Sequence, residues 1–204
     1  MYTESLHPYQ NEIVSAVYAQ WKQHTSTVFC IPTGTGKTRT ALNIVKNQRF
    51  LFVVHRDYLI DQTLNELNSG DVTVRSGKRK TGNSPSVIAT IQWLSAQNNL
   101  TKLLDERPFD VLVIDEAHHT VADSYQFLVK KFEEYNPQAK IVGMTATLQR
   151  ADNVPLKEVF HSLAYFKPIK FFVGFIDNEY IKPYNHTKHL AVVERQLPKV
   201  CNCA

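Results

Sequence analysis

The chain has 204 residues, of which 43% are hydrophobic and 21% are charged, and it contains seven Gly and nine Pro. This composition is ordinary for a globular protein, and it excludes collagen-like, mucin-like and wholly disordered chains. The net charge of +4 permits nucleic-acid binding without arguing for it. The longest apolar runs are far too short to cross a bilayer, and residues 1–21 contain no Lys or Arg. We therefore expect neither a membrane partner nor a signal or transit peptide.

The three cysteines, Cys30, Cys201 and Cys203, are unevenly spaced and form no disulfide framework. This usage favours a reducing, intracellular compartment, and the nucleus, the mitochondrion and the cytoplasm are all compatible with it. Cys30 lies inside an apolar run, so we expect it to be a small core residue. Cys201 and Cys203 lack the partners that a zinc site would need.

Short apolar runs alternate with segments of helical spacing along most of the chain. We expect strands at residues 27–31, 50–54, 72–74, 87–90, 109–114 and 140–144, and helical stretches at 13–21, 41–45, 59–67 and 125–132. This alternation, without hairpin signals, predicts an α/β fold with a doubly wound, mostly parallel sheet. Beyond about Val154 the alternation decays, and residues 165–204 suit either an edge strand with a tail or the start of a further unit.

The strongest motif is Gly34-Thr35-Gly36-Lys37-Thr38, which follows a predicted strand and precedes a predicted helix. Phosphates need backbone N–H donors at close range, and glycine leaves room for that approach. The helix N-terminus adds partial positive charge, the lysine can reach the β- and γ-phosphates, and the following hydroxyl can bind Mg²⁺. The alternative is an ordinary glycine-rich turn between strand and helix.

A second motif, Asp115-Glu116, ends the apolar strand predicted at 109–114. Ligands of parallel sheets bind beyond the carboxyl ends of the strands, and a carboxylate pair there is costly unless a cation compensates it. Asp115 would hold Mg²⁺, and Glu116 would orient and deprotonate the attacking water. The alternative is a solvent-facing acidic turn.

These motifs resemble the first RecA-like lobe of a superfamily 2 helicase or translocase of the DEAH type, in the branch of the type I and III restriction-enzyme motor subunits. The resemblance covers roughly residues 4–175, leaving 176–204 as a C-terminal extension. It implies an ATP- and Mg²⁺-dependent hydrolase. The implied nucleotide-binding residues are Gln10, Thr33, Gly34, Thr35, Gly36, Lys37 and Thr38, with Gln10 reading adenine.

The same resemblance assigns catalysis to Lys37, Asp115 and Glu116, and the metal to Thr38 and Asp115. A further set of residues would couple the nucleotide state to nucleic acid. These coupling residues are His118, Thr145 and Thr147. The strand that ends at Met144 should lie beside the strand of Asp115, so that the two threonine hydroxyls can bond to the acidic motif and to His118. The alternative for Thr145 to Thr147 is an ordinary polar turn.

Arg56, Thr90 and Gln92 match the loops of this family that contact a nucleic-acid strand. Hydroxyls and a single arginine suit phosphate contacts, which position a strand without reading its sequence. The alternatives are a helix cap at Thr90 and a surface arginine at position 56. The basic run at 75–80 suits either a solvated loop or added electrostatic attraction. Nothing singles out a ribose 2′-hydroxyl contact, so both DNA and RNA remain as partners.

The family works with two RecA-like lobes, and its second lobe supplies an arginine finger, but this sequence contains no such element. That finger contributes about 10³–10⁵ in rate, so we expect only trace hydrolysis and no translocation from this chain alone. Two classes stay open: a lobe or fragment of an ATP-dependent helicase or translocase, and a stand-alone regulatory module or inactive truncated product. Residues 200–204 follow neither helical nor strand spacing, which favours a truncated chain. A different P-loop NTPase ranks below both.

Overall fold

The computed structural model describes residues 6–67, 72–120, 122–147, 156 and 159–167. The helices are α1 (Pro8–Gln20), α2 (Lys37–Val45), α3 (Asp57–Asn65), α4 (Ile91–Ser95), α5 (Asn99–Glu106), the short 3₁₀ helix η1 (Ala117–His119) and α6 (Asp123–Tyr135). The strands are β1 (Ser26–Cys30), β2 (Phe50–Val54), β3 (Thr73–Arg75), β4 (Lys80–Thr81), β5 (Val87–Thr90), β6 (Val111–Asp115), β7 (Lys140–Thr145) and β8 (Ser162–Phe166). Within the described residues, no helix is long and apolar enough to cross a membrane.

The strands form one eight-stranded sheet in the order β4-β3-β5-β2-β6-β7-β1-β8. Every pairing is parallel except that of β3 with β4. The predicted doubly wound, mostly parallel α/β sheet is therefore confirmed. Because parallel strands point the same way, the loops that follow β1, β7, β6, β2 and β5 all leave the sheet at one edge, which we call the carboxyl rim.

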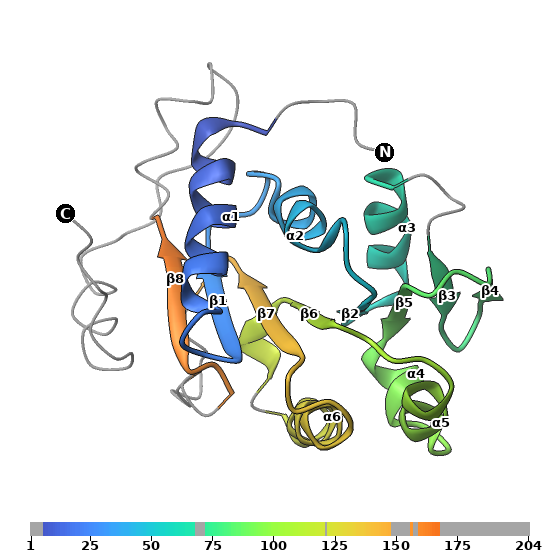
Figure 1. The fold of residues 1–204 in the computed structure, drawn as a ribbon. Coiled ribbons are helices and arrows are strands. Elements are labelled where there is room, and N and C mark those ends of the chain that lie inside the picture. The colour runs from blue at the N-terminus through green and yellow to red at the C-terminus, as the bar shows by residue number, and fades with distance from the viewer. Residues whose placement is uncertain (1–5, 68–71, 121, 148–155, 157–158, 168–204) are drawn as a thin grey trace.

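Helices cover both faces of the sheet, as Figure 1 shows: α1, α2 and α3 lie on one face, and α4, α5 and α6 lie on the other. Strand β2 illustrates how the sequence serves both layers. Phe50, Phe52 and Val54 pack into the core with α1 to α3, while Leu51 and Val53 pack into the core with α4 to α6. Side chains alternate between faces with a period of two, so a strand buried on both faces is apolar throughout.

Two regions near the β4 edge differ from the sequence prediction. Strands β3 and β4 form an antiparallel hairpin, closed by a 2.8 Å bond from the Ser76 N–H to the Arg79 carbonyl, whereas the sequence predicts no hairpin there. The turn carries none of the Asn-Gly or Asp-Gly pairs that mark tight hairpins, which explains the error. Helices α4 and α5 are absent from the prediction, although Leu100, Leu103 and Leu104 repeat at helical spacing and are buried.

Of the C-terminal segment 165–204, the structure describes only residues 165–167. Strand β8 lies at the sheet edge beside β1, so an edge strand exists, but it begins at Ser162 rather than at 165. Residues 168–204 lie outside the described residues, and they include the predicted extension, Cys201 and Cys203. The expectation for Cys30 is confirmed, because its side chain is 2% exposed within the core.

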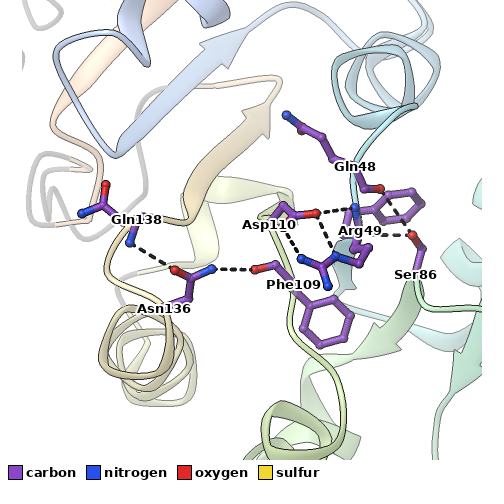
Figure 2. Close-up of polar contacts among 8 residues, drawn as sticks. Gln48, Arg49, Ser86, Phe109, Asp110, Asn136 and Gln138 are labelled. Atoms are coloured by element: carbon purple, nitrogen blue, oxygen red, sulfur yellow. Dashed lines mark hydrogen bonds and ion pairs between the residues drawn. The ribbon is translucent and has the colours of Figure 1, made fainter.

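The rim opposite the carboxyl rim, where the strands begin, is held by polar contacts (Figure 2). The Arg49 guanidinium donates to both oxygens of Asp110, with Nη2 2.7 Å from Oδ1 and Nε 3.0 Å from Oδ2. The Arg49 carbonyl in turn accepts from the Asp110 N–H at 2.7 Å. A second tie runs from the Asn136 side chain to the Phe109 carbonyl at 3.1 Å. These contacts fix the starts of β2 and β6 and the end of α6.

Candidate nucleotide and nucleic-acid site

The loop between β1 and α2 depends on its two glycines. Gly34 and Gly36 have φ angles of +80° and +76°, a region that residues with a side chain rarely adopt. A Cβ on Gly36 would also lie 2.6 Å from Nε2 of Gln10. The loop is closed internally by Thr35, whose hydroxyl donates to the Pro32 carbonyl at 2.6 Å. The predicted phosphate loop is therefore a tight turn that only glycine can complete.

Helix α1 docks onto this loop through two neighbouring side chains. The Tyr9 hydroxyl donates to the Thr35 carbonyl at 2.8 Å, and Gln10 Nε2 lies 3.5 Å from the Gly36 carbonyl. The other end of the Gln10 amide accepts from the His7 N–H at 2.9 Å. Gln10, the predicted adenine reader, is thus 2% exposed and lies against the loop. Tyr9 was missed by sequence reasoning, and its only signal was its place beside Gln10.

The remaining loop residues lie where α2 begins. Lys37 is the first residue of α2 and is 8% exposed, while Thr38 is half-buried and Thr33 is exposed. The free backbone N–H groups and the dipole of this nine-residue helix favour negative charge at the same place. The structure therefore gathers all the predicted phosphate-binding residues at one helix N-terminus.

The acidic pair ends β6, which is separated from β1 only by β7. Asp115 is 6% exposed, and burial together with Glu116 raises its pKa to about 6. Lys37 lowers the pKa of Asp115 and of Glu116, so the lysine and both carboxylates lie within electrostatic reach of one another. Among the described residues, no group of three or more His, Cys, Asp or Glu side chains is arranged to hold a metal.

Glu116 occupies an unusual backbone conformation directly after the strand. Its φ is +49° and its ψ +55°, the left-handed region that non-glycine residues seldom adopt. Its N–H donates to Asp115 Oδ1 at 2.8 Å, and its Oε2 lies 3.3 Å from His118 Nδ1. The hydrogen bond from His118 is the largest cause that lowers the pKa of Glu116, and Lys37 acts in the same direction. The turn thus presents an ionised carboxylate beside a buried one.

The predicted coupling residues meet at the end of β7. Met144 pairs with Asp115 across β7 and β6, as expected, so Thr145 comes next to the acidic turn. Its hydroxyl lies 3.0 Å from His118 Nδ1 and donates to the Thr147 carbonyl at 2.7 Å. Because that hydroxyl has only one hydrogen, it accepts from His118, which then carries its proton on Nδ1. Thr145 is fully buried, whereas Thr147 is exposed.

The predicted nucleic-acid residues lie on the neighbouring half of the same rim, after β2 and β5. Val54 pairs with Thr90, so the loops that follow these strands are adjacent. Arg56 is exposed immediately before α3, and Gln92 is exposed and donates to the His55 carbonyl at 2.8 Å. Thr90 caps α4 by accepting from the Trp93 N–H at 3.3 Å, as the alternative predicts, and its contact with nucleic acid stays a prediction.

The β3–β4 hairpin extends this half of the rim. Arg75, which ends β3, pairs with Ala89 of β5, so the turn that follows lies beside Thr90. In that turn Lys78 is exposed, and Arg79 reaches back to Asp61 of α3 with Nη1 2.5 Å from Oδ1. The basic run at 75–80 is therefore a hairpin whose turn lies at the carboxyl rim, and it is not a plain loop.

Two histidines connect these halves, and sequence reasoning gave neither of them a role. The His55 and His119 rings stack with centroids 4.5 Å apart, and His119 also contacts His118 at 4.2 Å. Burial, followed by Arg56 and His118, lowers the pKa of His55, which keeps that ring neutral at physiological pH. The only signal in the sequence was their position next to Arg56 and His118.

Residues 3–150 match the family described as type III restriction enzyme, res subunit. IRC3 of Saccharomyces cerevisiae, which is named as an ATP-dependent helicase, is 29% identical over an alignment of 185 residues that covers 80% of this chain and 26% of that protein. The DNA 3'-5' translocase XPB2 of Sulfurisphaera tokodaii is 31% identical over 152 residues, or 72% of this chain and 32% of that protein. The chain thus spans about a quarter to a third of the length of these relatives.

The fold is shared with solved structures. A nuclease-deletion mutant of the Type ISP restriction-modification enzyme LlaGI, solved with a DNA substrate mimic, matches with a TM-score of 0.65 at 18% identity over 84% of this chain and 20% of that chain. The family match covers most of the chain, and the RecA-like topology agrees with it. The chain belongs to the type III restriction enzyme res subunit family, and its fold is that of a RecA-like helicase domain.

Proposed function

We propose that this lobe binds ATP with Mg²⁺ on one half of its carboxyl rim and a single strand of DNA or RNA on the other half. Joined to a second RecA-like lobe, it would hydrolyse ATP to move along nucleic acid. The observation that carries the proposal is the convergence of Lys37, which begins α2, with Asp115 and Glu116 at the end of β6; the lysine lowers the pKa of both carboxyl groups.

The residues of the first half fit a magnesium nucleotide. Gly34 and Gly36 leave the loop backbone open to phosphate, and the buried Lys37 supplies positive charge. Asp115 is a buried carboxyl group whose pKa is raised to about 6, first by burial and then by the charge of Glu116, and a divalent cation bound beside it would favour its ionised form. Thr38 and Asp115 would hold Mg²⁺, which usually keeps waters and phosphate oxygens as its other ligands. Magnesium bound there would neutralise charge on the β- and γ-phosphates.

Glu116 is suited to act on the attacking water. Its pKa is held below the ordinary value by the hydrogen bond from His118, so it is ionised and can accept a proton. His118 also contacts Thr145, so a displacement of the end of β7 would change the position of Glu116. This arrangement supports the coupling role proposed for His118, Thr145 and Thr147.

The second half of the rim suits the backbone of a nucleic acid. Arg56, Gln92 and Lys78 are exposed there, on loops that follow three neighbouring strands. Contacts of this kind bind phosphates without reading sequence, and their strength falls as salt rises. An intracellular location is part of the proposal, supported by the free, buried thiol of Cys30.

The test is a pair of binding measurements on the purified chain. A fluorescent, non-hydrolysable ATP analogue should bind only with Mg²⁺, and oligodeoxythymidine or oligouridine should bind with a Kd that rises steeply with salt. ATP turnover should stay at a trace level, because an arginine finger contributes about 10³–10⁵ in rate. Lack of Mg²⁺-dependent nucleotide binding, or brisk nucleic-acid-stimulated turnover by this lobe alone, would contradict the proposal.

A further inference from the structure

Three imidazole rings form a continuous stack on the carboxyl rim. His55 and His119 lie nearly parallel, with an interplanar angle of 19° and centroids 4.5 Å apart. His119 and His118 are tilted by 41°, with centroids 4.2 Å apart. We call these residues the histidine stack. All three rings are half-buried, so they are enclosed by protein but not locked inside the core.

The histidine stack lies where the two halves of the rim meet. His55 follows β2, and His118 and His119 belong to η1, which follows β6; β2 and β6 are neighbouring strands. On the nucleic-acid side, Gln92 donates to the His55 carbonyl at 2.8 Å, and Arg56 is the next residue. The stack is therefore attached to the loops proposed to contact a strand.

On the nucleotide side, the stack ends at the hydrolytic machinery. His118 Nδ1 lies 3.3 Å from Glu116 Oε2 and 3.0 Å from the Thr145 hydroxyl. The path from Gln92 to Glu116 thus consists of direct contacts at every step. Coupling between two sites needs such an element whose position both sites can bias.

The contact between His55 and His119 is one of ring surfaces. His55 Nδ1 is buried and has no hydrogen-bond partner among the described residues, and the face of this ring stacks on His119 of η1. Stacked aromatic pairs are stabilised beyond the contribution of the area that they bury. The planar ring at position 119 therefore brings the two loops into contact through its stacking on His55.

We propose that His119 is a positioning residue that couples nucleic-acid occupancy to nucleotide binding, by transmitting displacements of the His55 loop through His118 to Glu116. The inference rests on the proposed function, because it requires both ligands. It adds a route that reaches the acidic turn from the His55 loop and not from the Thr145 segment, and it assigns a role to the second histidine of that turn. Coupling is reciprocal, so each ligand should change the affinity of the other by the same factor.

The experiment measures that factor in the purified chain. The Kd of a fluorescent, non-hydrolysable ATP analogue with Mg²⁺ is determined with and without saturating oligodeoxythymidine, and again with oligouridine. We expect a change of roughly five-fold or more in the wild type. In His119→Ala the ratio of the Kd values measured with and without the oligonucleotide should fall to near one, while the Kd for each ligand alone changes by less than about two-fold. His119→Phe retains a planar ring and should keep most of the coupling.

His24→Ala is the matched control, because His24 is also half-buried but lies between α1 and β1, away from the carboxyl rim. It should leave the ratio unchanged. If His119→Ala does not fold, His119→Leu tests the loss of the ring while keeping apolar volume. Both ligands binding independently in the wild type, unchanged coupling in the ringless variant, or failure of His119→Phe to restore it would each overturn the inference. Failure to bind either ligand would overturn the proposed function as well.

Discussion

The two rims of the sheet treat charge in opposite ways. At the rim where strands begin, Arg49 and Asp110 face each other in a two-pronged ion pair, and that pair lowers the pKa of Asp110 (Figure 2). At the carboxyl rim, Asp115 is buried beside Glu116, and its pKa is raised to about 6. At the first rim opposite charges pair with each other, whereas at the second two carboxyl groups stand side by side.

This difference separates residues that hold the fold from residues that are ready for a ligand. The Arg49–Asp110 pair ties the starts of β2 and β6 together and needs nothing further. Glu116 instead sits at a φ of +49°, and its neighbour Asp115 is ionised at a cost in stability. Perturbed groups of this kind gather at functional sites, so the carboxyl rim is the better candidate for a functional surface.

The largest expected effect is the loss of nucleotide binding in Lys37→Ala. The ammonium group would contact phosphate through charge-assisted hydrogen bonds, so its removal should raise the Kd of the Mg²⁺–ATP analogue by roughly 10- to 100-fold. Lys46→Ala, at the exposed C-terminal end of the same helix, is the control and should bind like the wild type. Circular dichroism would check that both variants fold. Equal affinity of Lys37→Ala and the wild type would remove the nucleotide site from this rim.

The next effect is a gain in the free energy of unfolding when Asp115 is replaced, whereas most substitutions of buried residues lower that free energy. The pKa of Asp115 rises from 3.8 to about 6 on folding, so the folded state holds the proton more tightly than the unfolded state. The free energy of unfolding should therefore fall as pH rises from about 4 to about 6, by on the order of 2 to 3 kcal/mol.

Asp115→Asn removes that titration, while its side-chain oxygen can still accept from the Glu116 N–H. Denaturant unfolding at several pH values should show the variant to be more stable than the wild type above pH 6, with a flatter dependence between pH 4 and 6. Its Mg²⁺-dependent nucleotide binding should weaken at the same time. A variant less stable than the wild type at pH 8 would mean that a compensating charge already neutralises Asp115.

A smaller gain in the free energy of unfolding should follow from relieving the backbone strain at Glu116. A residue with a side chain in the left-handed region carries about 1–3 kcal/mol of backbone strain. Glycine relieves that strain, but its greater flexibility in the unfolded chain offsets part of the gain. Glu116→Gly should therefore raise the free energy of unfolding by about 0.5 to 1 kcal/mol. Glu116→Gln keeps the backbone strain and removes only the charge, so comparing the two variants separates strain from electrostatics. Destabilisation by Glu116→Gly would show that its side-chain contacts outweigh the strain.

The sequence predicted those parts of the carboxyl rim in which chemistry restricts the choice of residue. Gly36 permits a φ that other residues avoid, and Asp115 directly follows an apolar strand, so both could be found from spacing and composition. The sheet was predictable for the same reason, because strands buried on both faces must be apolar throughout. Such positions can be predicted because the neighbouring residues in the sequence are enough to identify them.

Other features depend on neighbours that are distant in the sequence. The hydroxyl of Tyr9 reaches Thr35, and the ring of His55 meets His119, across 26 and 64 positions respectively. Either side chain would be unremarkable on any surface, and only the sheet order makes it part of the site. The β3–β4 hairpin was missed because its turn lacks a strong turn pair, so its basic residues could not be placed beside Thr90.

The smallest expected effect is on the melting temperature, when Asp110 at the opposite rim is replaced. The pKa of Asp110 is lowered, first by the hydrogen bond from Arg49, so its contribution to stability is present above its ordinary value of 3.8 and is lost as pH falls below it. Asp110→Asn should lower the melting temperature by only a few degrees or so at neutral pH, because the side chains of the pair are 46% and 39% exposed.

Its pH dependence should run opposite to that of Asp115→Asn. The ionised Asp110 stabilises the folded state and loses this contribution in acid, whereas the ionised Asp115 destabilises the folded state above about pH 6. The Kd of the nucleotide analogue should stay within about two-fold of the wild type, because Asp110 and Asp115 stand at opposite ends of the same strand region. A larger change in affinity would mean that the spacing of β2 and β6, set at the paired rim, also sets the geometry of the ligand rim. The two rims would then have to be treated as one coupled system.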